Sequence, residues 1–203
     1  MARKRVAVLI SGRGSNMAAL IEAARAPDYP ADIVLVISNR PEAAGLAHAA
    51  EAGIATSIVD QKAFTGRAAF EAALDAALAE AHIEFVCLAG FMRVLSPAFV
   101  ARWRDRLINI HPSLLPAFPG LDTHARALAA GATVHGCTVH FVREGVDDGP
   151  VIARAEVPVL PDDTPESLAA RVLAAEHRLY PEALARVASG QVQVVDERVV
   201  LSA

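Results

Sequence analysis

Two polar side chains, Asn109 and His111, stand at the end of an apolar run, residues 107–110, that is typical of a buried strand. Side chains two apart on an extended strand point to the same side. An amide N–H beside an imidazole can donate hydrogen bonds to one developing oxyanion. Pro112 and Pro116 then exclude further strand or helix, which suits a preorganised site. We interpret Asn109 and His111 as catalytic candidates for reaction at a carbonyl; the alternative is a histidine satisfied by local backbone bonds.

An acidic turn further along the chain offers a third group. Residues 146–150, VDDGP, place two acids before a glycine and a proline. If one of these two aspartates lies near His111, its carboxylate would orient the ring, as carboxylates do for imidazoles. The alternative is a solvated turn without a role, and the sequence does not show the contact.

A glycine-rich loop follows the first apolar run. Residues 11–16, SGRGSN, lie between a predicted strand over 6–10 and a predicted helix over 15–25. Glycine lets the backbone approach a ligand closely, and a helix N-terminus offers free N–H groups to a phosphate. We expect a phosphate monoester here; the alternative is a tight glycine turn without a ligand.

The same loop matches a dinucleotide fingerprint poorly. Met17 stands where the third glycine of that motif belongs. Asn39 and Arg40 follow the second predicted strand, where an NAD enzyme usually places an acid. An arginine there could meet a ribose 2′-phosphate, so an NADPH oxidoreductase remains an alternative. A non-catalytic phosphosugar-binding module is another.

Apolar strands alternate with alanine-rich helices through the first half of the chain. This order predicts a Rossmann-like α/β fold, with a mainly parallel sheet and helices on both faces. Ligands of such sheets bind beyond the carboxyl ends of the strands, and His111 lies at one of those ends. The predicted strands are 6–10, 32–38, 56–59, 85–89 and 107–110, and the predicted helices are 15–25, 41–52, 64–81 and 97–104.

The second half is richer in strands. Residues 133–143 and 151–159 predict strands that extend the same sheet. A helix is expected from Thr164 toward Gly190, because a capping threonine precedes a first-turn proline. We expect this helix to break or kink at Pro181. Residues 191–201 alternate and predict a closing hairpin.

Composition excludes several classes of protein. The 203 residues are 54% hydrophobic and carry a net charge of -4, which argues against nucleic-acid binding. No stretch approaches the 18 apolar residues of a membrane span, and the apolar run behind the basic N-terminus is too short for a signal peptide. We therefore expect a cytoplasmic protein in which Cys87 and Cys137 are buried thiols. His124, His135 and His140 lack metal-site spacing, so we expect no metal.

Taken together, several stretches resemble the folate-dependent phosphoribosylglycinamide formyltransferases of purine synthesis. The matching stretches follow the family's order and cover the chain nearly end to end. They are ISGRGSN at 10–16, CLAGFMRVLSPAFV at 87–100, NIHPSLLP at 109–116, HGCTVHFV at 135–142, VDDGPVI at 146–152 and EHRLYP at 176–181.

This resemblance implies a reaction. The amine of glycinamide ribonucleotide would attack the formyl carbon of 10-formyltetrahydrofolate, a co-substrate, and the products would be formylglycinamide ribonucleotide and tetrahydrofolate. Small molecules would be the partners, without nucleic acid, membrane or metal, and a homodimer stays open. One domain, 1–203, would comprise a phosphate-binding half, 1–110, and a catalytic and folate-binding half, 111–203.

The resemblance also implies roles for individual residues. Asn109 and His111 would bind the formyl oxygen, and Asp147 would handle the proton transfers. The substrate phosphate would meet Gly14, Ser15 and Asn16, and the ribose hydroxyls would meet Glu176. The expected folate pocket consists of Met92, Arg93, Val94, Leu95, Arg143, Glu144, Gly145 and Val146.

Two positions depart from the family's pattern. Ala117 stands where many members carry a basic residue, and Asp122 replaces a common histidine. Both lie on a loop outside Asn109, His111 and Asp147. The nearest alternatives are a 10-formyltetrahydrofolate hydrolase and a methionyl-tRNA formyltransferase. Each usually carries an additional domain for which we see no room here, and neither explains a phosphate loop as well.

Overall fold

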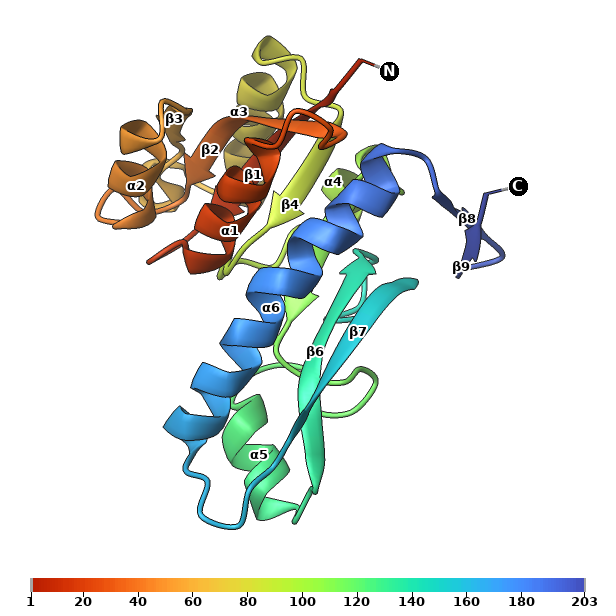
Figure 1. The fold of residues 1–203 in the computed structure, drawn as a ribbon. Coiled ribbons are helices and arrows are strands. Elements are labelled where there is room, and N and C mark those ends of the chain that lie inside the picture. The colour runs from red at the N-terminus through yellow and green to blue at the C-terminus, as the bar shows by residue number, and fades with distance from the viewer. Residues whose placement is uncertain (1, 203) are drawn as a thin grey trace.

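The structure is a computed structural model that describes residues 2–202 (Figure 1). Its strands are β1 (Lys4–Ile10), β2 (Ala31–Ser38), β3 (Ala55–Ile58), β4 (Phe85–Leu88), β5 (Leu107–His111), β6 (Val134–Phe141), β7 (Val151–Pro158), β8 (Val192–Val195) and β9 (Arg198–Leu201). Its helices are α1 (Ser15–Ala24), α2 (Gly45–Glu51), the 3-10 helix η1 (Gln61–Ala63), α3 (Arg67–Glu80), α4 (Pro97–Arg102), α5 (Thr123–Ala129) and α6 (Pro165–Ala188).

Seven strands form one sheet in the order β3-β2-β1-β4-β5-β6-β7. The pairs among β1 to β5 are parallel, whereas β6 and β7 add to the edge in antiparallel register. This confirms the predicted Rossmann-like sheet and its strand-rich extension. The chain leaves β1 toward β2 on one side and later returns to β4 on the other, so the switch point of the topology lies between β1 and β4.

The sheet is covered on both faces, as its uninterrupted apolar strands require. Alternate residues of β1 show this directly: Val8 and Ile10 belong to the core under α1 and α6, and Leu9 belongs to the core under α3 and α4. Phe70 and Leu74 of α3 are fully buried. Side chains that alternate between two buried faces hold the strand ends rigidly enough to position a site.

Two helices begin later than the sequence predicts. Helix α2 begins at Gly45 and not at residue 41, because the Gly45 N–H donates to the carbonyl of Gly12 (3.0 Å) and the preceding residues form a turn. Helix α3 begins at Arg67 and not at residue 64, because Asp60 caps η1 and Phe64 is extended. Both errors arise from local contacts that periodicity does not report.

Of the break or kink predicted at Pro181, the break is wrong. Helix α6 runs without interruption from Pro165 to Ala188, and its start has the predicted Thr164 cap. The hydroxyl of the fully buried Tyr180 lies 3.0 Å from the carbonyl oxygen of Leu88, which anchors the helix to the sheet. Tertiary packing of this kind offsets the hydrogen bond that a proline removes from a helix.

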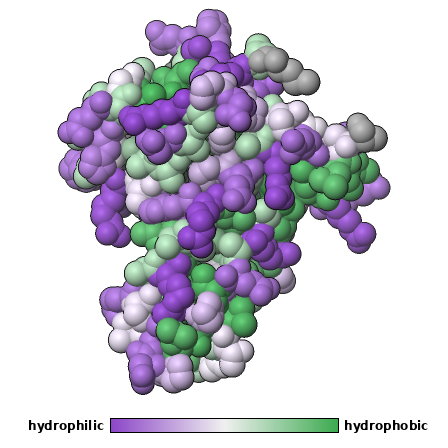
Figure 2. All heavy atoms as spheres, in the orientation of Figure 1, coloured by the Kyte–Doolittle hydropathy of each residue, from purple (hydrophilic) through white to green (hydrophobic). Residues whose placement is uncertain are grey.

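The predicted C-terminal hairpin is confirmed, and β8 and β9 form a small sheet of their own. Val192, Val194 and Val199 pack on the core beneath α6. Val195 and Leu201 are exposed, and Figure 2 shows the hairpin as an apolar surface beside the C-terminus. Within residues 2–202, no helix is long and apolar enough to cross a membrane.

Candidate active site

The structure brings His111 and Asp147 into contact from opposite halves of the sequence. His111 ends β5, and Asp147 lies in the loop between β6 and β7. Their Nδ1 and Oδ1 atoms are 3.2 Å apart, and both side chains are largely buried. The other Asp147 oxygen accepts the Gly120 N–H at 2.7 Å, and the Nε2 of His111 lies 3.1 Å from the carbonyl oxygen of Phe118. Each ring nitrogen therefore faces an oxygen acceptor.

The environment of Asp147 favours its charged form. Burial alone would raise the pKa of Asp147, but the hydrogen bonds from His111 and Gly120 lower it below its ordinary value. A carboxylate that stays ionised beside an imidazole can fix the ring's orientation and accept a proton.

Asn109 contacts a histidine that the sequence did not assign to the site. Its Nδ2 lies 3.3 Å from Nε2 of His140, the residue paired with it across β5 and β6. Nδ1 of His140 lies 3.0 Å from the carbonyl oxygen of Phe141, and burial lowers the pKa of His140. A neutral His140 with its hydrogen on Nδ1 accepts one Asn109 N–H, which leaves the second N–H free for a ligand.

These groups line one cavity of about 680 Å³. Asn109, His111 and Asp147 line it together with all eight residues expected for the folate pocket. One wall is the segment after β4 and another is the loop after β6, and both supply exposed apolar side chains, Met92, Val94 and Val146. The cavity thus combines apolar walls with a few convergent polar groups, which is typical of a small-molecule site.

The glycine-rich loop has the geometry expected of an anion site. Gly14 precedes α1 in the left-handed region with φ of 73°, and Gly45 approaches so closely that a side chain at Gly14 would crowd it. Helix α1 begins at Ser15, so the N–H groups of Ser15 and Asn16 belong to its unpaired first turn. This backbone has the positive helix end and the close approach that a phosphate requires.

Glu176 reaches this loop from α6. Its Oε2 accepts a hydrogen bond from Nδ2 of Asn16 at 2.6 Å, and its side chain is 6% exposed. Burial raises the pKa of Glu176, although the Asn16 hydrogen bond opposes the rise. The contact joins two residues that the resemblance assigns to one ligand, although they are 160 positions apart in the chain.

The comparisons with known proteins agree with this geometry. A family model described as formyl transferase matches residues 4–184. The chain belongs to the formyl transferase family. Of the alternatives left open by the sequence, this membership favours a formyl-group enzyme over a nicotinamide oxidoreductase.

Two curated relatives extend the match. The chain is 55% identical over 197 residues to the trifunctional purine biosynthetic protein adenosine-3 of Drosophila pseudoobscura pseudoobscura, with 96% of this chain covered. The chain spans 14% of the length of that relative. It is 44% identical over 189 residues to the phosphoribosylglycinamide formyltransferase of Escherichia coli (strain K12), covering 93% of this chain and 89% of that protein.

Solved structures have the same fold. Glycinamide ribonucleotide transformylase 1 from Symbiobacterium toebii superposes with a TM-score of 0.96 at 45% identity, covering 99% of this chain and 95% of that one. A formyltetrahydrofolate deformylase from Burkholderia mallei superposes with a TM-score of 0.90 at 31% identity, covering 100% of this chain and 71% of that one. The same fold therefore occurs in a transformylase and in a deformylase. The fold alone does not show which of the two reactions a protein catalyses, so the residues of the site must decide it.

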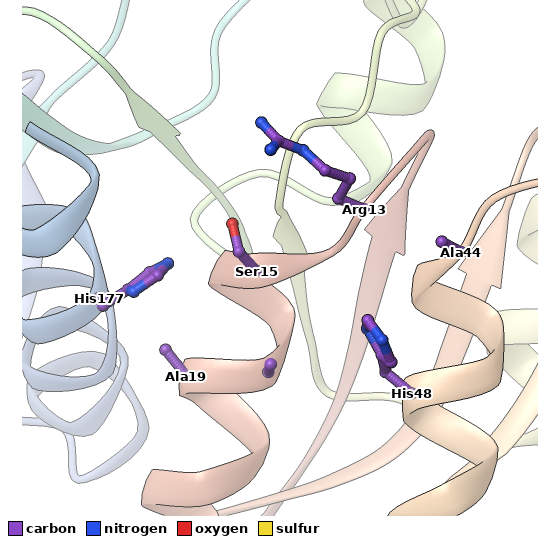
Figure 3. Close-up of a pocket in the computed structure, with 7 residues that line it drawn as sticks. Arg13, Ser15, Ala19, Ala44, His48 and His177 are labelled. Atoms are coloured by element: carbon purple, nitrogen blue, oxygen red, sulfur yellow. The ribbon is translucent and has the colours of Figure 1, made fainter. Parts of the chain in front are cut away.

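A second cavity, of about 630 Å³, lies beside the glycine-rich loop. Figure 3 shows Arg13 and Ser15 near the start of α1, with His48 on α2 and the His177 ring pointing from α6 toward α1. The rest of its lining consists of small alanine side chains, Ala18 and Ala44.

The two departures from the family's pattern lie on the loop before α5. Ala117 contributes its backbone, because its carbonyl accepts the Ser113 hydroxyl at 2.6 Å. Asp122 precedes α5 in the left-handed region with φ of 55°, is exposed and lines the larger cavity. The hydrogen bonds and the ion pair of His111 and Asp147 involve neither of these side chains.

The remaining histidines and the cysteines lie as separate features. His135 is fully buried, and its ring meets those of His124 and Phe118 edge to face. Cys87 and Cys137 are buried free thiols, as predicted. Among residues 2–202, no three His, Cys, Asp or Glu side chains are grouped so that they could hold a metal ion.

Sequence reasoning missed Ser11 as the junction of three loops. Its hydroxyl donates to Oδ1 of Asn39 (2.6 Å) and accepts the N–H of Met92 (2.8 Å), and its own N–H donates to the carbonyl of Gly90 (3.2 Å). Ser11 thereby connects the loops after β1, β2 and β4. The strand order would have revealed the junction, but the linear sequence gave no signal for it.

Proposed function

We propose that this chain transfers the formyl group of 10-formyltetrahydrofolate to the amine of N1-(5-phospho-D-ribosyl)glycinamide. The products are formylglycinamide ribonucleotide and tetrahydrofolate, a step of purine synthesis. The relatives named for this activity support the proposal. The observation that carries it is the 3.2 Å contact between His111 and Asp147, beside Asn109, in one cavity.

The reaction needs hydrogen-bond donors for an oxyanion. When the amine adds to the formyl carbon, the carbonyl oxygen gains negative charge, and preorganised donors stabilise it. The free Nδ2 hydrogen of Asn109 and the Nε2 of His111 supply these donors, and the formyl oxygen takes the place of the Phe118 carbonyl at His111. The fixed partners on the far side of each group limit reorganisation during the reaction.

The reaction also needs a base, because an ammonium group has no lone pair for attack. Asp147 fits this role: it is ionised, largely buried and held by two hydrogen bonds. In the mechanism we propose, the ammonium first releases one proton to solvent, and the neutral amine adds to the formyl carbon. Asp147 accepts the second proton from that nitrogen and returns it to the departing folate nitrogen as the tetrahedral intermediate collapses and the bond between the formyl carbon and the folate nitrogen breaks.

The phosphoribosyl group binds at the start of α1. Gly14, Ser15 and Asn16 hold the phosphate with backbone N–H groups and the helix dipole. Glu176, next to Asn16, accepts hydrogen bonds from the ribose hydroxyls. These interactions position the amine and contribute binding energy remote from the reacting bond.

The folate occupies the larger cavity. Exposed apolar side chains on its rim suit a flat heterocycle and its aromatic extension. The lining residues proposed for folate are Met92, Arg93, Val94, Leu95, Arg143, Glu144, Gly145 and Val146. Because 10-formyltetrahydrofolate brings an already activated formyl group, the proposed chemistry uses no metal or redox cofactor.

We propose a single domain, 1–203, with a phosphate-binding half, 1–110, and a catalytic and folate-binding half, 111–203. The site crosses this division, because Asn109 and residues 92–95 lie in the first half and Glu176 lies in the second. We propose a cytoplasmic location, since free buried thiols are typical of a reducing compartment. We also propose that the protein forms a homodimer and that it binds neither nucleic acid nor a membrane.

One assay tests the proposed function. Enzyme is mixed with glycinamide ribonucleotide and 10-formyl-5,8-dideazafolate, and release of the deformylated product is followed. We expect release that depends on the ribonucleotide and a formylated ribonucleotide as its co-product. Release at the same rate without the ribonucleotide would identify a deformylase and overturn the proposal.

A further inference from the structure

The side chain of Arg143, proposed above as a folate contact, is held from outside the cavity. Its Nε donates to Oε2 of Glu197 at 2.6 Å, and its Nη2 donates to Oδ1 of Asp105 at 2.6 Å. Glu197 lies in the turn of the β8–β9 hairpin and also pairs with Arg104. The guanidinium of Arg143 therefore joins the loop after β6 to the C-terminal hairpin and to the segment before β5.

Arg143 is also the first residue of the loop, 143–148, that contains Asp147. Its backbone N–H donates to the carbonyl of Asp148 at 3.2 Å, which closes the loop. At Gly149 a side chain would come within 2.0 Å of the Phe141 carbonyl and 3.1 Å of the Arg143 Cγ. The loop therefore packs against the aliphatic part of the Arg143 side chain, and the orientation of this side chain limits where Asp147 lies.

We infer that Glu197, through Arg143, is a positioning residue that holds the 143–148 loop in the geometry needed for formyl transfer. The inference rests on the proposed function, because it assigns the loop to folate and Asp147 to proton transfer. It gives the C-terminal hairpin a role in the reaction, although the hairpin lies apart from the seven-stranded sheet (Figure 1).

Burial and geometry distinguish this contact from an ordinary surface ion pair. Isolated pairs between exposed side chains contribute little. Here the Arg143 side chain is 11% exposed, and it binds two carboxylates from different segments as well as the Val142 carbonyl. Burial alone would lower the pKa of Arg143, but the hydrogen bonds with Glu197 and Asp105 raise it. A planar guanidinium held on several sides orients its own backbone segment.

The hairpin is in turn fixed well enough to act as a support. Val192, Val194 and Val199 are partly buried and pack against the core, and the Ser202 N–H donates to the carbonyl of Gln191 at 2.9 Å. The turn itself, Asp196 and Glu197, is left-handed at both residues. This conformation leaves the Glu197 carboxylate directed at Arg104 and Arg143.

The test compares two neighbouring substitutions to the same residue. Glu197→Asn removes the carboxylate that contacts Arg143 and keeps a residue that tolerates the left-handed region. Asp196→Asn removes the same charge at the preceding position, where no ion pair is present among residues 2–202. We measure kcat, the KM of each substrate, and binding of 10-formyl-5,8-dideazafolate by calorimetry. Hydrogen–deuterium exchange of residues 142–149 is followed in parallel.

For Glu197→Asn we expect about three- to tenfold weaker binding of the folate analogue and a similar loss of kcat, the size of a broken contact network. Exchange in residues 142–149 should accelerate, while the KM of glycinamide ribonucleotide stays within about twofold. Asp196→Asn should match the wild-type enzyme in every measurement. A double variant, Arg143→Met with Glu197→Asn, should be no worse than Arg143→Met alone.

Two results would overturn the inference. One is a Glu197→Asn enzyme that equals Asp196→Asn in folate binding, kcat and exchange, even if its melting temperature has fallen. The other is full additivity in the double variant. Failure of the proposed function looks different, because the wild-type enzyme itself would then not transfer the formyl group, whereas the binding and exchange comparisons would still report on Glu197.

Discussion

At the scale of single residues, the site consists of polar atoms that each have a defined partner. Asp147 uses one oxygen for His111 and the other for the Gly120 N–H. Asn109 uses one N–H for His140. Groups held in this way need little reorganisation when charge develops, which is the physical basis of oxyanion stabilisation.

Removing the Asn109 amide should slow turnover strongly. Asn109→Ala deletes one proposed oxyanion donor, so we expect kcat to fall by roughly a hundredfold or more. Steady-state kinetics with both substrates at saturation measure the effect. Gln193→Ala, which removes an exposed amide on β8, is the control and should leave kcat unchanged. An unchanged kcat in Asn109→Ala would remove Asn109 from the mechanism.

Replacing the Asp147 carboxylate should nearly abolish transfer without unfolding the protein. Asn keeps the shape of the side chain but cannot accept the amine's proton. Asp148→Asn is a matched control, because Asp148 is exposed and, among residues 2–202, its carboxylate accepts only the neighbouring Gly149 N–H. Transfer rates and circular dichroism of both variants are compared. If Asp147→Asn keeps most of its activity, the proposed base is wrong.

At the scale of elements, loops at the switch point of the sheet and after β6 build the site. Ser11 joins the loops after β1, β2 and β4 through its backbone and hydroxyl. The loop after β6 depends on Gly149, whose backbone φ of 133° is rarely adopted by residues that have a side chain. The strands position these loops, and the loops position the polar atoms.

Gly149→Ala tests whether the loop after β6 needs its observed conformation. The added Cβ would stand 2.0 Å from the Phe141 carbonyl, so the loop must move. We expect at least about tenfold weaker binding of 10-formyl-5,8-dideazafolate, equivalent to ~1.4 kcal/mol, and a lower melting temperature. Gly66→Ala, where a Cβ meets nothing within 4 Å, is the control. Equal binding by the two variants would contradict the account.

At the scale of the whole molecule, the architecture could be predicted from the sequence more fully than the contacts between side chains. The alternation of apolar strands with helices was sufficient to predict the parallel sheet, because each strand buries both of its faces. Periodicity could not predict the continuous helix at Pro181, which depends on packing of Tyr180 against the sheet. It also could not assign His140 or Glu197 to the surroundings of the site, because strand pairing and hairpin docking join distant segments.

The fully buried His135 should make stability depend on pH. Burial lowers its pKa from 6.5 to about 4. Between these values the unfolded chain binds a proton that the native state does not, so stability is lost as pH falls, by about 1.4 kcal/mol per pH unit. Melting temperatures at about pH 7.5 and about pH 5 measure the loss. His135→Leu should lose less than the wild-type protein between these conditions, and an equal loss would refute this role.

The central claim is that Asn109, His111 and Asp147 surround one carbonyl. The most direct test is a crystal structure with glycinamide ribonucleotide and 10-formyl-5,8-dideazafolate bound. We predict the formyl oxygen within hydrogen-bonding distance of Asn109 Nδ2 and His111 Nε2, about 3 Å, with the ribonucleotide amine on the side of Asp147. A formyl group bound elsewhere in the cavity, beyond reach of all three side chains, would contradict the account.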